Sequence, residues 1–83
     1  MIPGFDGKKL QEMMDWKGYD SLSLAGQFLS RGHMVQVWQI NKWRTCAGDP
    51  SINNVFVLAD IFGVEVWAFQ GNRKENQRQR DHG

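Results

Sequence analysis

The chain has 83 residues, which allows one domain and leaves no room for a separate substrate domain. Its hydrophobic content of 41% suffices for a small core. Its formal net charge is only +1, which by itself indicates no class of partner, and its single cysteine, Cys46, excludes an internal disulfide or a cysteine-rich zinc site. No apolar run approaches the ~20 residues of a membrane span and no signal peptide is visible, so we expect a soluble, cytoplasmic protein.

Two N-terminal helices are predicted from capping residues and glycines. Asp6 caps a first helix that runs to about Lys17, and Gly18 ends it. A second helix follows a cap at Asp20 and is broken by residues 31–33, Arg-Gly-His. Helical spacing places apolar side chains on one face of each helix: Leu10, Met13 and Met14 in the first, and Leu24, Ala25, Phe28 and Leu29 in the second.

A third helix is predicted from about Met34 to Thr45. Turning 100° per residue places Ile40 at the centre of a buried face that includes Val37 and Trp43. The opposite face is an outer face, made of Val35, Trp38, Lys42 and Thr45, with Gln39 and Asn41 on its flanks. An ordinary amphipathic surface helix has the same pattern, so the helix alone does not establish a binding function.

The rest of the chain predicts two more helices and a tail. Residues 48–50, Gly-Asp-Pro, form a loop, and Ser51 caps a fourth helix that ends at Gly63. A short fifth helix covers about 65–69. The expected architecture is therefore an all-α bundle of about five short helices in one domain, residues 1–70, followed by a disordered polar and basic tail, residues 71–83.

Charge is distributed unevenly along the chain. No acidic residue occurs between Ser21 and Gly48, whereas Arg31, Lys42 and Arg44 lie within that stretch. The centre of the chain is thus the part that best tolerates a phosphate backbone. Three cations in such a stretch also suit an ordinary solvated surface.

Four segments, in this order, resemble the XRE (Cro/CI-type) helix-turn-helix domain. Leu10 matches an apolar position of that family's first helix, Leu24-Ala25 matches its second, and residues 40–44 resemble the end of its recognition helix. Residues 51–64, preceded by Pro50, resemble its fourth helix. The resemblance covers about residues 7–69 and is greatest to small temperate-phage repressors. It implies a sequence-specific regulator that binds operator DNA through the third helix, as a homodimer.

One departure from the family pattern affects the register. Ala25 and Ile40 are fifteen residues apart, about five more than in helix-turn-helix domains of this type. The second helix or the following turn must therefore be extended through residues 30–33. This leaves open where the third helix starts and which of its polar side chains point at bases.

The candidate DNA-binding residues fall into two groups. Lysine and amide side chains hydrogen-bond to base edges, which makes the outer face of the third helix the candidate for groove contact: Trp38, Asn41, Lys42 and Thr45, with Gln36 and Gln39 as further candidates. Candidate phosphate contacts are Arg31, His33 and Arg44, with non-specific attraction from Arg73 and Lys74.

A surplus of apolar side chains near the end of the domain suggests a subunit interface. Its candidate residues are Phe56, Val57, Ile61, Trp67 and Phe69. The alternative is that these side chains simply complete a small core.

No enzyme chemistry is predicted. His33 and His82 have no further ligand at metal-binding spacing, and Cys46 has no histidine nearby in sequence, so we expect no catalytic residues, no metal and no cofactor. Two other functions stay open beside the DNA-binding regulator. One is a helical protein-interaction module such as an antirepressor, and the other is an antitoxin that binds both DNA and a protein partner.

Overall fold

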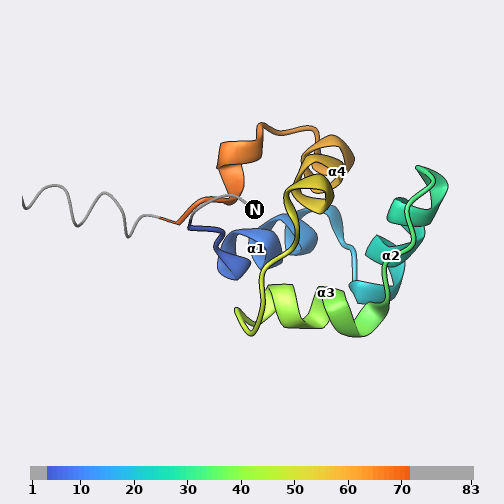
Figure 1. Cartoon of the computed structure of the whole chain (residues 1–83), viewed down its shortest axis with the longest axis horizontal. Helices are drawn as coiled ribbons and strands as arrows, with labels where there is room; N and C mark the ends of the chain where they lie inside the picture. The colour runs from blue at the N-terminus through green and yellow to red at the C-terminus, as the bar shows by residue number, and fades with distance from the viewer. Residues whose placement is uncertain (1–3, 72–83) are drawn as a thin grey trace, which may run out of the picture.

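The computed structural model describes residues 4–71, and this part of the chain is helical (Figure 1). Its elements are α1 (Gly7–Lys17), α2 (Ser21–Ser30), α3 (Val37–Arg44), α4 (Ile52–Phe62) and the 3₁₀ helix η1 (Val66–Phe69). Within these residues the β structure is limited to one isolated bridge between Phe5 and Gln70. The prediction of a mostly helical fold is confirmed. The predicted tail lies outside the described residues from position 72 onward, and so do Arg73, Lys74 and His82.

Local capping interactions set most helix boundaries where the sequence predicts them. The side chains of Asp6, Asp20 and Ser51 accept hydrogen bonds of 2.8–3.3 Å from backbone N–H groups in the first turns of α1, α2 and α4. Gly18 and Gly63 follow α1 and α4 with φ of 77° and 69°, the left-handed conformation that ends a helix at low cost for glycine.

The core lies where the four helices and η1 meet. Its fully buried side chains come from every element and include Leu10, Met14, Leu24, Phe28, Ile40, Val55, Leu58 and Phe69. The ring of Phe28 lies 6.0 Å from that of Trp43, and Phe62 and Phe69 are 6.4 Å apart. These contacts tie α2 to α3 and α4 to η1.

Gly7 marks the closest approach between two helices. A Cβ atom at this position would lie less than 3.0 Å from the backbone oxygen of Trp43, at the C-terminal end of α3. Because that neighbour is backbone and not a flexible side chain, only glycine allows α1 and α3 to pack this closely.

The third helix starts later than the sequence predicts. It begins at Val37 instead of Met34, and residues 31–36 form an irregular connection from α2. This six-residue connection is longer than the ~3–4 residues of an ordinary helix-turn-helix turn. Val35 precedes the helix and is 6% exposed, so its predicted place on the outer face is wrong: a helical wheel does not apply to irregular backbone.

Three residues expected at a dimer interface lie in the core instead. Val57, Ile61 and Phe69 are 9%, 7% and 0% exposed. The physical reason is that α4 packs against both α2 and η1, so it buries more than one face. Phe56 and Trp67 remain on the surface, at 56% and 66% exposure.

Candidate nucleic-acid interface

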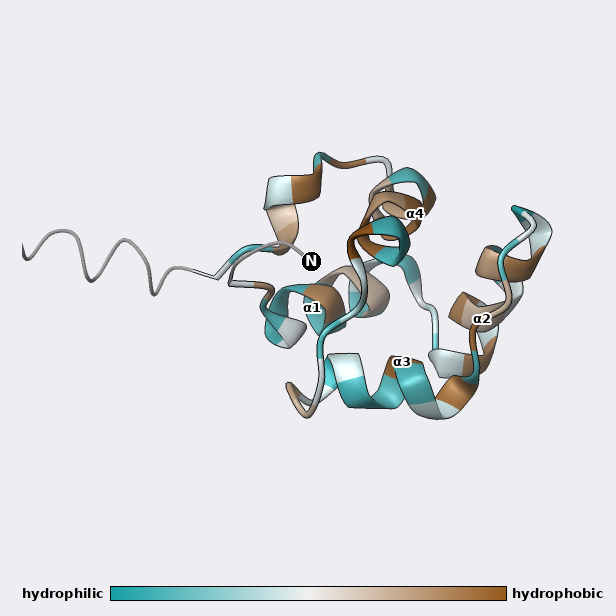
Figure 2. Ribbon diagram, in the orientation of Figure 1, coloured by the Kyte–Doolittle hydropathy of each residue, from teal (hydrophilic) through white to brown (hydrophobic). Residues whose placement is uncertain are grey.

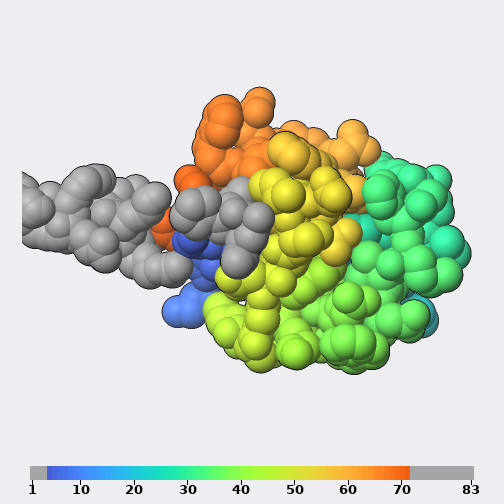
Figure 3. Space-filling model, viewed as in Figure 1, coloured from blue at the N-terminus to red at the C-terminus, as the bar shows by residue number. Residues whose placement is uncertain are grey.

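The outer face of α3 carries three exposed side chains, Trp38, Asn41 and Lys42, and the exposed Thr45 follows directly as the C-terminal cap. Ile40 and Trp43, on the opposite face, are 0% and 4% exposed, as the helical wheel predicts. The helix runs along one edge of the molecule, and its surface is uncovered there (Figures 2 and 3). With eight residues, α3 is about 12 Å long, at 1.5 Å of rise per residue.

Trp38 and Lys42 form one unit of this surface. They are one helical turn apart, and the Nζ of Lys42 lies 5.7 Å from the centroid of the Trp38 ring. Together with Gln39, Gly48 and Asp49 they border a shallow, open depression of about 160 Å³. The ammonium group offers three hydrogen-bond donors beside a flat aromatic surface that is 60% exposed. This combination suits contact with phosphates, sugars and base edges.

The amides at the start of α3 have a structural role. The Oε1 of Gln39 accepts a hydrogen bond of 2.9 Å from the backbone N–H of Gln36, which precedes the first turn. Gln39 is only half-exposed, while Gln36 is exposed. One end of the Gln39 amide is therefore used to hold the start of the helix.

Arg44 is engaged inside the protein. Its Nε donates to Gln11 Oε1 of α1 at 2.6 Å, and its Nη1 donates to Ser21 Oγ of α2 at 2.7 Å. The side chain thus connects three helices from a half-buried position. The prediction that Arg44 contacts phosphate is not supported by this placement, because two of its donor nitrogens are already paired.

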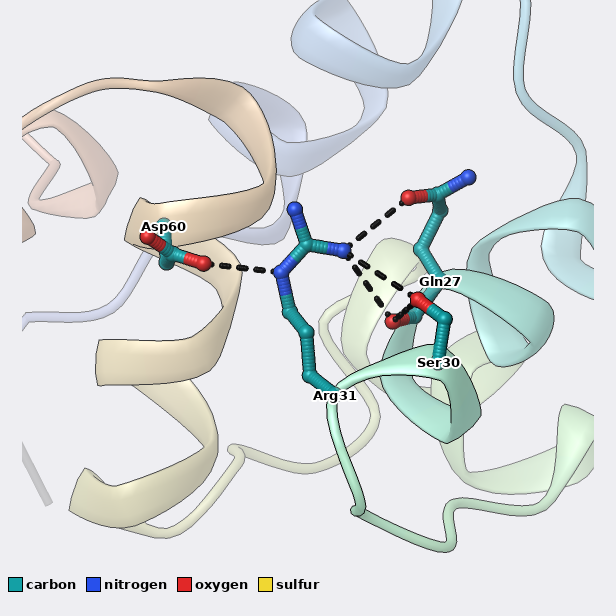
Figure 4. A network of polar contacts seen from close by, with 4 residues as sticks. All are labelled: Gln27, Ser30, Arg31 and Asp60. Atoms are coloured by element: carbon teal, nitrogen blue, oxygen red, sulfur yellow. Dashed lines mark hydrogen bonds and ion pairs between the residues drawn. The ribbon is translucent and has the colours of Figure 1, made fainter.

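Arg31 is likewise committed, as Figure 4 shows. Its Nε donates to Asp60 Oδ2 of α4 at 2.7 Å, and its Nη1 donates to the backbone oxygen and Oε1 of Gln27 at 3.2 and 3.0 Å. The ion pair ties the end of α2 to α4. Because the guanidinium is paired with Asp60, Arg31 is less available to a phosphate than its sequence position indicates. His33, in contrast, is exposed in the connection.

The described residues were also compared with the requirements of a metal site. Within residues 4–71, no three His, Cys, Asp or Glu side chains gather as a metal site would require, and Cys46 is exposed.

Asp20 has a pKa below its ordinary value because the backbone N–H and the hydroxyl of Ser23 stabilise its carboxylate at the start of α2. Within the same residues, no helix has the length and apolar character to span a bilayer.

Two features of the site were not predicted from the sequence. Gln11 and Ser21 support α3 from 33 and 23 residues away in the chain, and no local pattern signals that pairing. The prediction that Leu29 lies on the buried face of the second helix is wrong: it is 59% exposed, because at 100° per residue it is turned about 140° from Leu24 and 100° from Phe28, the two fully buried side chains of α2. Together with Leu22, which is 71% exposed, it gives α2 a second apolar face. Their seven-residue spacing was the available signal, since it puts both on one side of the helix.

No protein-family model, curated protein or solved structure matches this chain.

Proposed function

We propose that this chain is a small helix-turn-helix DNA-binding regulator of the XRE type, which represses transcription by occupying operator DNA through α3. The observation that carries the proposal is the outer face of α3: Trp38, Asn41, Lys42 and Thr45 are exposed together on a helix whose other face is buried. Such a helix fits the major groove, which is about 12 Å wide. The sequence pattern that resembles small temperate-phage repressors supports the same proposal.

The arrangement of α2 and α3 supports the same function. The hydroxyl of Ser21, in the first turn of α2, reaches Asn41 in α3, so the start of α2 lies beside the middle of α3. In helix-turn-helix domains the second helix of such a pair lies in the major groove, while the first crosses the DNA backbone. The six-residue connection is the difference from that family, and it adds His33 to the surface near the pair.

The test is a binding measurement by fluorescence anisotropy on the DNA that flanks the gene, at several salt concentrations. We expect Lys42→Ala to weaken binding by about 1–3 kcal/mol and to lower the salt slope by about 1, because one phosphate or base contact is lost. Lys17→Ala is the matched control, since Lys17 lies 5.0 Å from the ring of Trp16 in a comparable pair on α1. An affinity that changes neither with salt concentration nor on Lys42→Ala substitution would contradict DNA binding through α3.

A second candidate is a helical protein-interaction module, such as an antirepressor or an antitoxin with a protein partner. It is favoured by the exposed apolar side chains of α2, Leu22 and Leu29, and by Met34, which is 73% exposed. Substituting Leu22 and Leu29 by serine discriminates between the two functions. DNA affinity should persist under the first proposal, because neither residue lies on the outer face of α3.

A further inference from the structure

A chain of polar contacts behind α3 ends at one of the exposed groove candidates. Gln11 accepts from Arg44 at 2.6 Å, Arg44 donates to the Oγ of Ser21 at 2.7 Å, and that hydroxyl donates to the Oδ1 of Asn41 at 2.5 Å. Ser21 is 6% exposed although it is polar, whereas Asn41 is exposed. This series of hydrogen bonds, the Arg44 network, therefore runs from α1 through a buried hydroxyl to the surface.

The number of donors and acceptors in the Arg44 network determines how the Asn41 amide is oriented. A guanidinium group only donates, so Ser21 Oγ must be the acceptor of the bond from Arg44. The one hydrogen of that hydroxyl is left over, and in a nearly closed site it needs an acceptor of its own. Asn41 Oδ1 supplies it. With the amide turned over, its NH₂ group would face the hydroxyl and the hydroxyl hydrogen would have no partner.

The consequence is that Asn41 turns its NH₂ group outward. Its Oδ1 is directed at α2, where Ser21 occupies one of its two lone pairs, and its Nδ2 has no partner within residues 4–71. An asparagine that pairs with adenine in two places uses its oxygen on N6 and its nitrogen on N7, so both ends of the amide must be available. Guanine instead offers two acceptors, N7 and O6, to the major groove.

We propose that Asn41 is a specificity-determining residue that reads guanine in preference to adenine, and that Ser21 and Arg44 are positioning residues that set this preference by fixing the amide. This proposal rests on the proposed function, because it concerns which base α3 selects. The neighbouring hydroxyl of Thr45 is bound within the helix, since its Oγ1 donates to the Asn41 backbone oxygen at 2.8 Å.

The experiment selects binding sites from a pool of random duplexes and then measures affinities on the selected site and on single-base variants. With the unmodified protein we expect one position where guanine is preferred over adenine by about tenfold. Asn41→Ala should abolish that preference. Ser21→Ala, which keeps Asn41 but frees its amide to turn, should reduce the preference at the same position to about twofold or less.

Ser30→Ala is the control, because it makes the same substitution at the other end of α2, where the hydroxyl donates to the backbone oxygen of Gln27 and accepts a long hydrogen bond of 3.5 Å from Arg31, away from Asn41. It should leave every base preference unchanged. Retained guanine preference in a folded Ser21→Ala protein, or adenine preferred at the position that Asn41→Ala affects, would overturn the proposal.

A measurement on the free protein separates this proposal from the proposed function. In an NMR spectrum, the Asn41 side-chain NH₂ protons should show at most a weak nuclear Overhauser effect to the Ser21 β protons. A strong effect would show the amide turned the other way and would refute the orientation whether or not DNA binds. If no site were enriched from the random pool, sequence-specific binding itself would be refuted, and guanine recognition with it.

Discussion

The two tryptophans of α3 offer a direct test of how this helix is oriented. Trp43 is 4% exposed and its ring lies 6.0 Å from that of Phe28, whereas Trp38 is 60% exposed. A buried tryptophan removes about 150–250 Å² from water, and at about 25 cal/mol per Å² its loss costs roughly 4–6 kcal/mol as an upper bound. Measured losses for truncating a buried tryptophan to alanine are about 3–5 kcal/mol.

Trp43→Ala should therefore remove a large share of the stability of a chain this short, whose whole free energy of unfolding we expect to be about 4–12 kcal/mol. Trp38→Ala removes less than half of the same contact area and leaves no enclosed cavity, so we expect it to cost about 1–2 kcal/mol at most. The difference follows from burial alone, because the substitution and the helix are the same.

Thermal unfolding followed by far-ultraviolet circular dichroism distinguishes the two variants. At about 4–8 °C per kcal/mol, Trp43→Ala should lower Tm by more than about 12 °C or abolish the cooperative transition. Trp38→Ala should keep a cooperative transition and lose DNA affinity instead. Equal destabilisation by the two substitutions would refute the assigned faces of α3, and with them the outer face on which the proposed function depends.

The remaining predictions concern packing, charge, assembly and pH. Gly7→Ala should destabilise the fold by about 1–3 kcal/mol in urea unfolding, because its Cβ would collide with the backbone of α3. Gly26→Ala is the control: its Cβ would meet open space on α2, so it should stabilise the fold by about 0.5–1 kcal/mol. Asp49 borders the same depression as Lys42, so Asp49→Asn should strengthen DNA binding at low salt by removing a charge that repels phosphate, and unchanged affinity would place the DNA elsewhere. If Phe56 and Trp67 pair two copies, Trp67→Glu should lower the apparent mass at tens of micromolar while helix content stays; a protein that is monomeric at every concentration, alone and on DNA, would rule this pairing out. The pKa of Asp20 is lowered in the folded state, so its charged form stabilises the fold at pH values above the ordinary pKa of 3.8, and this stabilisation is lost as the pH falls through the lowered pKa. The difference in unfolding free energy between the unmodified protein and Asp20→Asn should therefore shrink as the pH falls through this range. A difference that stays constant with pH would contradict this reasoning.

Much of the helical layout was predictable from the sequence because it depends on short-range rules. Asp6, Asp20 and Ser51 cap helices through hydrogen bonds to residues two or three positions away, and Gly18 ends one through its own backbone freedom. The buried and outer faces of α3 also follow from a fixed turn of 100° per residue, once the residue is inside the helix. These signals act over less than two helical turns, so the chain carries them whatever the rest of the fold does.

The tertiary structure decided which side chains are free to act. Arg31 and Arg44 both look available in the sequence, yet Asp60 and Gln11, which engage them, are 29 and 33 residues away. Val57 and Ile61 looked like a surplus of apolar surface, but α4 is covered on more than one face and buries them. Such outcomes depend on which elements pack together, and contacts between residues distant in the chain leave no periodic pattern in it. The orientation of the Asn41 amide belongs to the same class, because it is held by a hydroxyl twenty residues earlier.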